Sequence, residues 1–329
     1  MKASSASRRP LLRALVFAVG ALCIAPLAAA QAPYPSKPIT IIVGYPPGGS
    51  TDLTGRTLGD ALARQLGVPV VIENLGGAGG AIGAQKAANA TPDGYTLFVG
   101  ANNEVAINKL VTKTTKYDLK DFTPIGLIAS QPMVLVASQA SGVKNIDQFI
   151  AKVKAAPGKY SYGSSGVGTA LHLAGEMVKE RAGLFMTHIP YRGVAPLTTD
   201  LVGGNLEFGV FVLSSGLPHI KGGKVVALGT TEARRSPQTP DIPALGEHAQ
   251  LKGIDIGSWF VLMGPAKLPE PVVTRLKTAL VESLKSPDFR SKMEASGSTV
   301  AAADVAIGPF LQSEVAKYRK IVQFAKIEQ

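Results

Sequence analysis

Three times in this sequence, a glycine-rich turn separates an apolar run of strand character from a segment of helical periodicity. The first turn spans 44–52, after the β-branched run 39–43 and before a helical pattern that begins near Leu53. N–H groups in the first turn of a helix lie at the positive end of its dipole, so such a junction can bind a carboxylate or phosphate. The alternative is an ordinary tight turn, with Ser50 or Thr51 as helix cap and a structural role for Asp52.

The other two glycine-rich turns span 74–80 and 164–168. The second turn departs from the dinucleotide-binding pattern, because Ile82 stands where its last glycine belongs. The third adds the hydroxyl donors of Ser164 and Ser165, and His172 follows one turn into the next helix. Together the turns indicate a site for a small anion rather than for a nucleotide.

Strand and helix patterns alternate from residue 39 onward, which predicts an α/β fold with a parallel sheet covered by helices. The two apolar runs on either side of Gln131 and Pro132 predict the first crossing between two lobes. The expected strands are 39–43, 68–73, 95–100, 125–129, 133–138, 160–163, 186–190, 206–212, 225–230 and 256–263; the expected helices are 53–66, 81–90, 102–111, 146–155, 169–182, 196–201, 271–284 and about 304–324.

Residues 1–30 have the features of a cleavable secretory signal. Arginines at 8, 9 and 13 precede an uncharged apolar segment, which ends in three alanines and predicts cleavage after Ala30. The polar, proline-rich stretch 31–38 that follows argues against a membrane span. The single cysteine, Cys23, lies within the signal, so the remaining chain excludes disulfides, thiolate metal sites and cysteine nucleophiles.

Cleavage would leave 299 residues and lower the formal net charge from +11 to +7. This length is sufficient for two lobes with separate cores. The lysines and arginines are scattered and aromatic residues make up only 6% of the chain, so we expect no nucleic-acid partner.

The common catalytic and metal-binding motifs are missing. The nearest match to a hydrolase nucleophile motif, 163–167, has Val167 in place of its last glycine. The sequence has no phosphate loop of nucleotide hydrolases, no zinc-protease motif and no calcium loop. Its four histidines are far apart, and we expect packed or surface roles for all except His172. We therefore expect no enzyme activity, metal or cofactor, and a protein that binds a small anion and releases it unchanged.

The order of several short motifs resembles a known family. They are Tyr34-Pro35, the turn 46–52, Val71-Ile72-Glu73-Asn74, the turn 92–97, the stretch 188–193 and the stretch 200–204. In these motifs the chain resembles the solute-binding proteins of tripartite tricarboxylate transporters, often called Bug proteins. The resemblance covers nearly all of the chain after residue 30.

This resemblance implies a type II periplasmic binding-protein fold, in which crossing strands join two α/β lobes and the ligand lies in the cleft between them. We expect the first lobe over 31–131, the second over 132–228, and a return to the first lobe with the C-terminal helices over 229–329. It also implies a carboxylate ligand, a periplasmic location and permease subunits in the membrane as partners. We expect the receptor itself to be a monomer.

Positions that match the family's motifs predict the ligand-binding residues. The first lobe contributes Tyr45, Pro47, Gly48, Gly49, Ser50, Thr51, Gly77, Ala78, Gly79 and Gly80; the second contributes Ser164, Ser165, Gly166, Gly168, Thr169, His172, Tyr191, Arg192 and Gly193.

Phe211 is a further candidate, because it stands where many relatives carry an aspartate. The loss of that acid argues against an amino-acid ligand and predicts a carboxylate with an apolar or aromatic body packed on Phe211. The alternative is that Phe211 belongs to the core.

The function that follows is capture of a carboxylate by closure of the lobes, for delivery to a transporter. Two alternatives stay open at this point: a periplasmic sensor that passes the ligand to a signalling receptor, and a secreted hydrolase.

Overall fold

The computed structural model describes residues 33–325 and residue 327. The chain divides into a short unit that ends at Tyr34 and a unit Pro35–Gln329, to which all the elements below belong. The expected signal peptide and its cleavage site lie outside the described residues.

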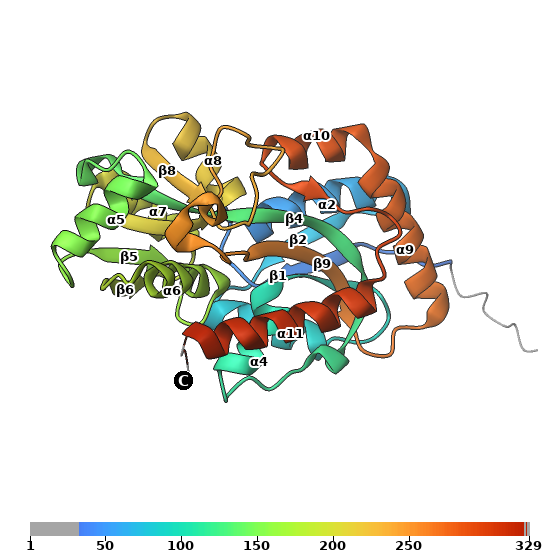
Figure 1. Ribbon diagram of the computed structural model, residues 1–329. Helices are drawn as coiled ribbons and strands as arrows, with labels where there is room; N and C mark the ends of the chain where they lie inside the picture. Colours follow the sequence, from blue (N-terminus) through green and yellow to red (C-terminus); the bar gives the residue numbers. More distant parts are fainter. Residues whose placement is uncertain (1–32, 326, 328–329) are drawn as a thin grey trace, which may run out of the picture. The chain divides into compact units, whose positions relative to one another are not determined.

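The first sheet is built around the strand that precedes the first glycine-rich turn. This strand, β1, is parallel to β2 on one side and to β3 on the other, and β9 and β4 continue the sheet as antiparallel strands (Figure 1). Helix α2 packs on β1, β2 and β3. The elements of this first lobe are β1 (Ile39–Val43), α2 (Ser50–Leu66), β2 (Val70–Asn74), α3 (Ala81–Ala88), β3 (Thr96–Ala101), α4 (Asn108–Val111), β9 (Gly257–Pro265), α9 (Glu270–Lys285), α10 (Pro287–Ala295), β10 (Thr299–Val300) and α11 (Ile307–Ala325).

The long strand β4 (Phe122–Ser138) belongs to both sheets and joins the lobes. Its first part pairs with β9 as far as Pro132, and from Met133 onward it pairs with β7 and β8. The strand thus changes partners at the position expected for the crossing, and one continuous strand replaces the two expected runs. A proline is tolerated here because the strand changes partners at this point.

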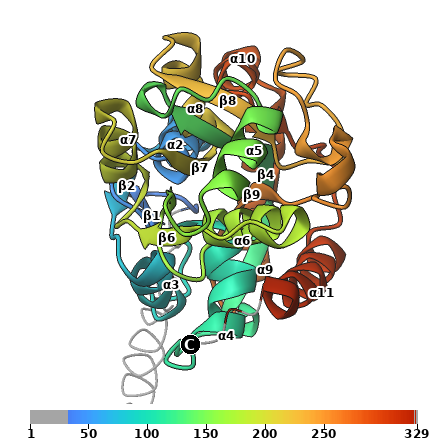
Figure 2. The ribbon, with the colours of Figure 1, turned by 60° about the vertical axis from the view of Figure 1, so that its left-hand side comes forward.

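The second sheet repeats the construction of the first. Strand β5 is parallel to β6 and β7, and β4 lies between β7 and β8. In Figure 2, which brings this lobe forward, α5 and α6 are seen in front. The elements of this second lobe are α5 (Ile146–Ala155), β5 (Ser161–Ser164), α6 (Ala170–Ala182), β6 (Thr187–Pro190), α7 (Val194–Gly203), β7 (Phe208–Val212), α8 (Leu213–Lys221) and β8 (Val225–Thr230). The fold is thus the predicted two-lobed α/β fold.

Residues after β8 remain with the second lobe for longer than expected. Thr230 forms a bridge with Ala244, and Nε2 of His248 contacts Asp147 of α5 at 3.1 Å. The short turn Ala249–Leu251 packs against α6 of the same lobe. The return to the first sheet therefore comes at Gly257, where β9 begins, rather than near residue 229.

Three local features differ from the sequence-based expectations. Residues 103–107 form a π-helical turn within the helix expected over 102–111. Helix α8 lies where no helix was expected, because Pro218 and two serines weaken its helical pattern. Helix α10 is separated from α9 at Ser286, where Pro287 supplies a favourable first helical residue.

The first glycine-rich turn depends on close packing of α3. A Cβ at Gly83 would lie 2.8 Å from Cα of Gly44 and 2.9 Å from the carbonyl oxygen of Leu75, and neither backbone atom can move cheaply. We predict that Gly83→Ala lowers the free energy of unfolding by about 1–3 kcal/mol through overpacking, in spite of a gain of about 1 kcal/mol in helix propensity.

The matched control is Gly308→Ala in α11, where an added Cβ meets no atom within 4 Å. Urea denaturation measures both variants, and the control should be neutral or slightly stabilising. Equal stability of the two variants would contradict the packing argument.

Candidate functional site

A cavity lies where the strand-to-helix turns of both lobes meet. It encloses about 620 Å³, including the space open to solvent at its mouth. Turns from the first lobe and helix starts from the second line it, which is the position where α/β sheets generally bind ligands. The lining residues are Tyr45, Pro46, Pro47, Gly49, Ser50, Thr51, Ala101, Asn102, Asn103, Met133, Ser165, Ala170, Leu171, Arg192, Gly193, Val194, Ala195, Pro196, Val212, Ser258 and Phe260. We call this space the inner cavity.

A second, wider space adjoins the inner cavity and shares part of its lining. It measures about 1660 Å³, again with open solvent included. We call it the outer cavity. The shared residues are Tyr45, Pro46, Pro47, Ser165, Arg192 and Gly193. The turn 76–80 lines the outer cavity alone, so the two spaces together form one cleft with a narrow inner end.

Three helices present their first residues to the inner cavity: α2, α6 and α7. The first N–H groups of a helix have no acceptor within it and carry its positive dipole end. Helix α2 has Gly49 as its N-cap with no side-chain cap, so the expected capping by Ser50 or Thr51 is wrong. Within the described residues, no acceptor is found for the N–H groups of Ser50 and Thr51. These groups are therefore available to a bound anion.

Asp52, in the first turn of α2, does not disturb this arrangement. Its carboxylate accepts hydrogen bonds from the N–H of Gly48 at 2.9 Å, from Asn74 at 2.9 Å and from Arg56 at 3.1 Å. Partial burial acts to raise its pKa, but these three bonds outweigh it and hold the pKa below its usual value. Its charge is thus offset by Arg56 and hydrogen-bonded by Gly48 and Asn74, which supports the structural role considered for it.

Glu104 is a buried acid beneath both first-lobe turns. It is 2% exposed, its Oε2 accepts from the N–H of Ala101 at 3.3 Å, and its Oε1 has no partner among the described residues. Gly44 and Gly80 pack against it so closely that a Cβ on Gly80 would lie 2.6 Å from Oε1. Burial raises the pKa of Glu104 to about 8, so it is mainly uncharged at pH 7. A neutral acid here avoids repelling an anion in the cleft.

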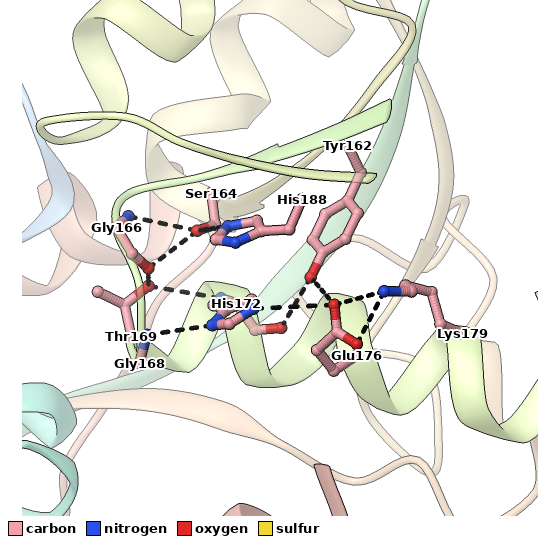
Figure 3. Close-up of polar contacts among 9 residues, drawn as sticks. All are labelled: Tyr162, Ser164, Gly166, Gly168, Thr169, His172, Glu176, Lys179 and His188. Atoms are coloured by element: carbon pink, nitrogen blue, oxygen red, sulfur yellow. Dashed lines mark hydrogen bonds and ion pairs between the residues drawn. The ribbon is translucent and has the colours of Figure 1, made fainter. Parts of the chain in front are cut away.

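The serine loop of the second lobe rests on two stacked histidines (Figure 3). Their ring centroids, in His172 and His188, lie 3.8 Å apart. Nδ1 of His172 accepts from the N–H of Gly168 at 3.0 Å, and Nε2 of His188 lies 2.7 Å from Oγ of Ser164. Burial lowers the pKa of His172 to about 4 and that of His188 to about 3. Both rings are therefore neutral at pH 7, as an acceptor at Nδ1 requires.

The predicted site residues fall into three groups. Those that line the inner or the outer cavity are Tyr45, Pro47, Gly49, Ser50, Thr51, Gly77, Ala78, Gly79, Gly80, Ser165, Gly166, Tyr191, Arg192 and Gly193. Those that line neither but belong to the supporting turns are Gly48, Ser164, Gly168, Thr169 and His172.

Phe211 forms the third group, because the structure places it in the core. It is fully buried among Val134, Val136 and Leu217, and it lines neither cavity. Its neighbour Val212 lines the inner cavity instead. The expected packing of a ligand on Phe211 is therefore corrected to the alternative, a core role, because successive strand residues face opposite sides of a sheet and Val212 is the one that faces the cavity.

Several residues that line the inner cavity are not among those predicted from the sequence. Asn102 and Asn103 directly follow β3, at the same strand end that was used to find the other turns. Their position at this strand end is a usable signal, although the pattern over 102–111 predicts a short helix there. Met133 of β4, Val212 of β7 and Phe260 of β9 supply an apolar wall, which the pairing of β4 with both other strands brings to the cavity.

Arg192 is the only charged side chain among the described residues that line either cavity. It is exposed, and no described residue forms an ion pair with it. The cleft as a whole is thus electropositive, with helix N-termini at its inner end and one guanidinium shared by both cavities.

Two further findings concern the described part of the chain. It contains no group of three or more histidine, cysteine, aspartate or glutamate residues that is suitable for a metal ion. None of its helices combines the length and the apolar character that crossing a membrane requires.

Fold and cleft define a two-lobed solute-binding protein, and comparison with known proteins agrees. Residues 54–327 match the model of the tripartite tricarboxylate transporter family receptor, and the chain belongs to that family. Protein BugT of Bordetella pertussis is 32% identical over 88% of this chain and 90% of its own.

Two solved structures are similar over nearly their whole length. Periplasmic binding protein BugD has a TM-score of 0.85 and 32% identity, covering 90% of this chain and 99% of its own. The protein described as R. palustris Rpa4515 with adipate has a TM-score of 0.86 and 30% identity at the same coverage. The resemblance proposed from sequence motifs is thereby confirmed, and the family is one of solute-binding receptors.

The buried acid leads to a pH prediction. The folded pKa of Glu104, about 8, lies above its unfolded value of 4.5, so the native state holds its proton more tightly. Its contribution to stability is complete below pH 4.5 and is lost as the pH rises through 8. We expect Glu104→Gln, which cannot ionise, to reduce the loss of stability between pH 6 and pH 9.

Urea denaturation at the two pH values measures this effect, with Glu270→Gln at an exposed acid as control. The control should keep the pH dependence of the wild type. The same pH dependence in Glu104→Gln would show that Glu104 does not titrate in this range.

Proposed function

We propose that this protein is a periplasmic receptor that captures a small organic carboxylate in its cleft and delivers it to the membrane subunits of a tripartite transporter. One observation carries the proposal: unpaired N–H groups at the start of α2, together with the starts of α6 and α7, face a cavity whose lining, among the described residues, includes no acid. Fixed dipoles of this kind replace the hydration shell of an anion without reorganising side chains.

The lining also supports a particular kind of carboxylate. An acid in the cleft would hold the ammonium group of an amino acid, and neither cavity has one among its described lining residues. Met133, Val212 and Phe260 offer apolar surface to the body of the ligand, in place of Phe211. The adipate named with one relative is a carboxylate with an apolar chain, which fits this selection.

Capture by closure explains why the donors are divided between two lobes. Taking a carboxylate out of water is costly unless its oxygens find partners. The start of α2 is available in the first lobe before closure, and closure then adds the starts of α6 and α7. The ligand thus binds one lobe first and stabilises the closed form through the other.

A thermal-shift titration of residues 31–329 tests the function. The panel contains citrate, adipate and other dicarboxylates, glutamate, aspartate, nicotinate and benzoate. A ligand at about one hundred times its dissociation constant should stabilise the fold by roughly 2.7 kcal/mol.

We expect hits among acids with an apolar or aromatic body, and recovery of the ligand chemically unchanged. Tighter binding of glutamate or aspartate would contradict the proposed selection. Conversion of the ligand would indicate an enzyme, and failure of every carboxylate would refute the receptor.

Gly49→Val should block the inner cavity without straining the turn. Gly49 has φ −88° and ψ 173°, a conformation that valine favours, and its nearest contact for an added Cβ is an oxygen at 4.0 Å. The added side chain would stand at the cap of α2, beside the N–H groups offered to the ligand. Gly166 is less suitable for this test because its φ of +142° penalises any side chain.

We expect at least a tenfold loss of affinity for the best carboxylate by calorimetry, with a melting temperature close to that of the wild type. Gly308→Val, at an open position of α11, serves as control. Wild-type affinity in Gly49→Val would exclude this turn from the binding site.

A further inference from the structure

Asn103, which lies outside the family's motifs, connects three of the turns around the cleft. It begins the π-helical turn after β3, is 7% exposed and lines the inner cavity. Its Oδ1 accepts a hydrogen bond from the N–H of Ala170 in the second lobe at 2.7 Å. Its Nδ2 donates to the hydroxyl of Tyr45, which in turn donates to the carbonyl of Gly79 at 3.1 Å. One amide therefore joins both first-lobe turns to the start of α6.

The chemistry of this network requires an amide. The N–H of Ala170 is only a donor, so an oxygen must face it, and the amide orientation follows from that. The hydroxyl proton of Tyr45 is already used for Gly79, so the tyrosine oxygen needs a donor, which the amide NH₂ supplies. An aspartate would lack that donor, and an apolar side chain would leave both partners unsatisfied.

The two halves of the network respond differently to closure. The bond to Tyr45 lies within the first lobe, so separation of the lobes would not break it. The bond to Ala170 crosses between lobes, and in an open form water would satisfy both of its ends. Oγ of Ser50 and Oγ of Ser215, 2.7 Å apart, form a second cross-lobe contact. Contacts made in only one of two states shift the equilibrium toward that state.

The bond also occupies a particular donor. Ala170 is the first residue of α6, and its N–H is one of the dipole-end groups that would otherwise be free. Asn103 uses this group and leaves the N–H of Leu171, the next residue of α6, without an acceptor among the described residues. At the start of α6, the N–H of Ala170 is thus used for the contact between the lobes, and the N–H of Leu171 is left for the cavity.

We propose that Asn103 is a positioning residue that latches the closed state: it holds the turns of Tyr45 and Gly79 in register with the start of α6 and prolongs the residence of the bound solute. This inference rests on the proposed function for the role of the solute. The latch itself concerns the two lobes, with or without a ligand.

Asn103→Ala tests the latch. For the best carboxylate of the panel, we expect a dissociation rate roughly five to ten times higher by stopped flow, as expected for the loss of about one net hydrogen bond. The association rate should change less than twofold. Asn145→Ala is the matched control, because it removes the N-cap of α5, with its hydrogen bond to the N–H of Gln148 at 2.9 Å, and so costs stability outside the cleft.

Ala170→Pro removes the same bond from the other side. Proline is favoured as the first helical residue, and Thr169 before it already has the extended conformation that proline requires. We expect the same increase in dissociation rate, and no further increase in the double variant. Additive effects would show that the two residues act separately and would overturn the latch.

The distance between the lobes is a second readout, which a merely structural role of Asn103 would not change. The only cysteine is Cys23, so residues 31–329 with Lys113→Cys and Lys154→Cys carry one spin label on each lobe. Double electron–electron resonance without any ligand should show a larger open fraction in Asn103→Ala than in the wild type or Asn145→Ala. Identical distance distributions, together with an unchanged dissociation rate, would refute the latch.

The ligand-free distance measurement also distinguishes the latch from the proposed function. If no carboxylate bound the wild type, the receptor proposal would fail, but the ligand-free distances would still decide the latch. A shift toward open distances in Asn103→Ala and Ala170→Pro would support it, and its absence in both would refute it.

Discussion

The structure depends on a constraint of helix geometry: the first N–H groups of a helix cannot be satisfied within it. Where such an end faces solvent, water accepts hydrogen bonds from these N–H groups, but α2, α6 and α7 all begin at one cavity. The glycine-rich turns keep side chains away from these groups, and Gly49 caps α2 without a side-chain acceptor. The protein therefore leaves donors free where a ligand can use them, at the carboxyl ends of its parallel strands.

These N–H groups can bind an anion only if negative charge is kept out of the cleft. Asp52 has its charge offset by Arg56, Asn74 and the N–H of Gly48 within one turn. Burial removes most of the charge of Glu104, because it raises the pKa to about 8 and keeps the side chain mainly protonated. The two acids near the turns thus add little negative charge to the cleft. This division of roles connects the local packing of the glycines to the selectivity of the cleft.

Much of this arrangement follows from local sequence. The strand, glycine turn and helix order predicted α2, α6 and their turns, because proline, glycine and apolar period act over a few residues. Details set by tertiary contacts were not predictable in the same way. Strand geometry decides that Val212 faces the cavity and Phe211 faces the core. Asn103 lies in a π-helical turn that has no local signature. The partner of Asn103, Ala170, lies 67 residues away, beyond the reach of periodicity.

The central claim is that free helix N-termini hold the carboxylate, and amide NMR tests it most directly. In a titration of the labelled protein with the best carboxylate, the amide protons of Ser50, Thr51 and Leu171 should move downfield as they donate to the ligand. The amides of Gly48 and Ala170 already donate to Asp52 and Asn103 and should move much less. Saturable binding that leaves the first three amides unmoved would contradict the account.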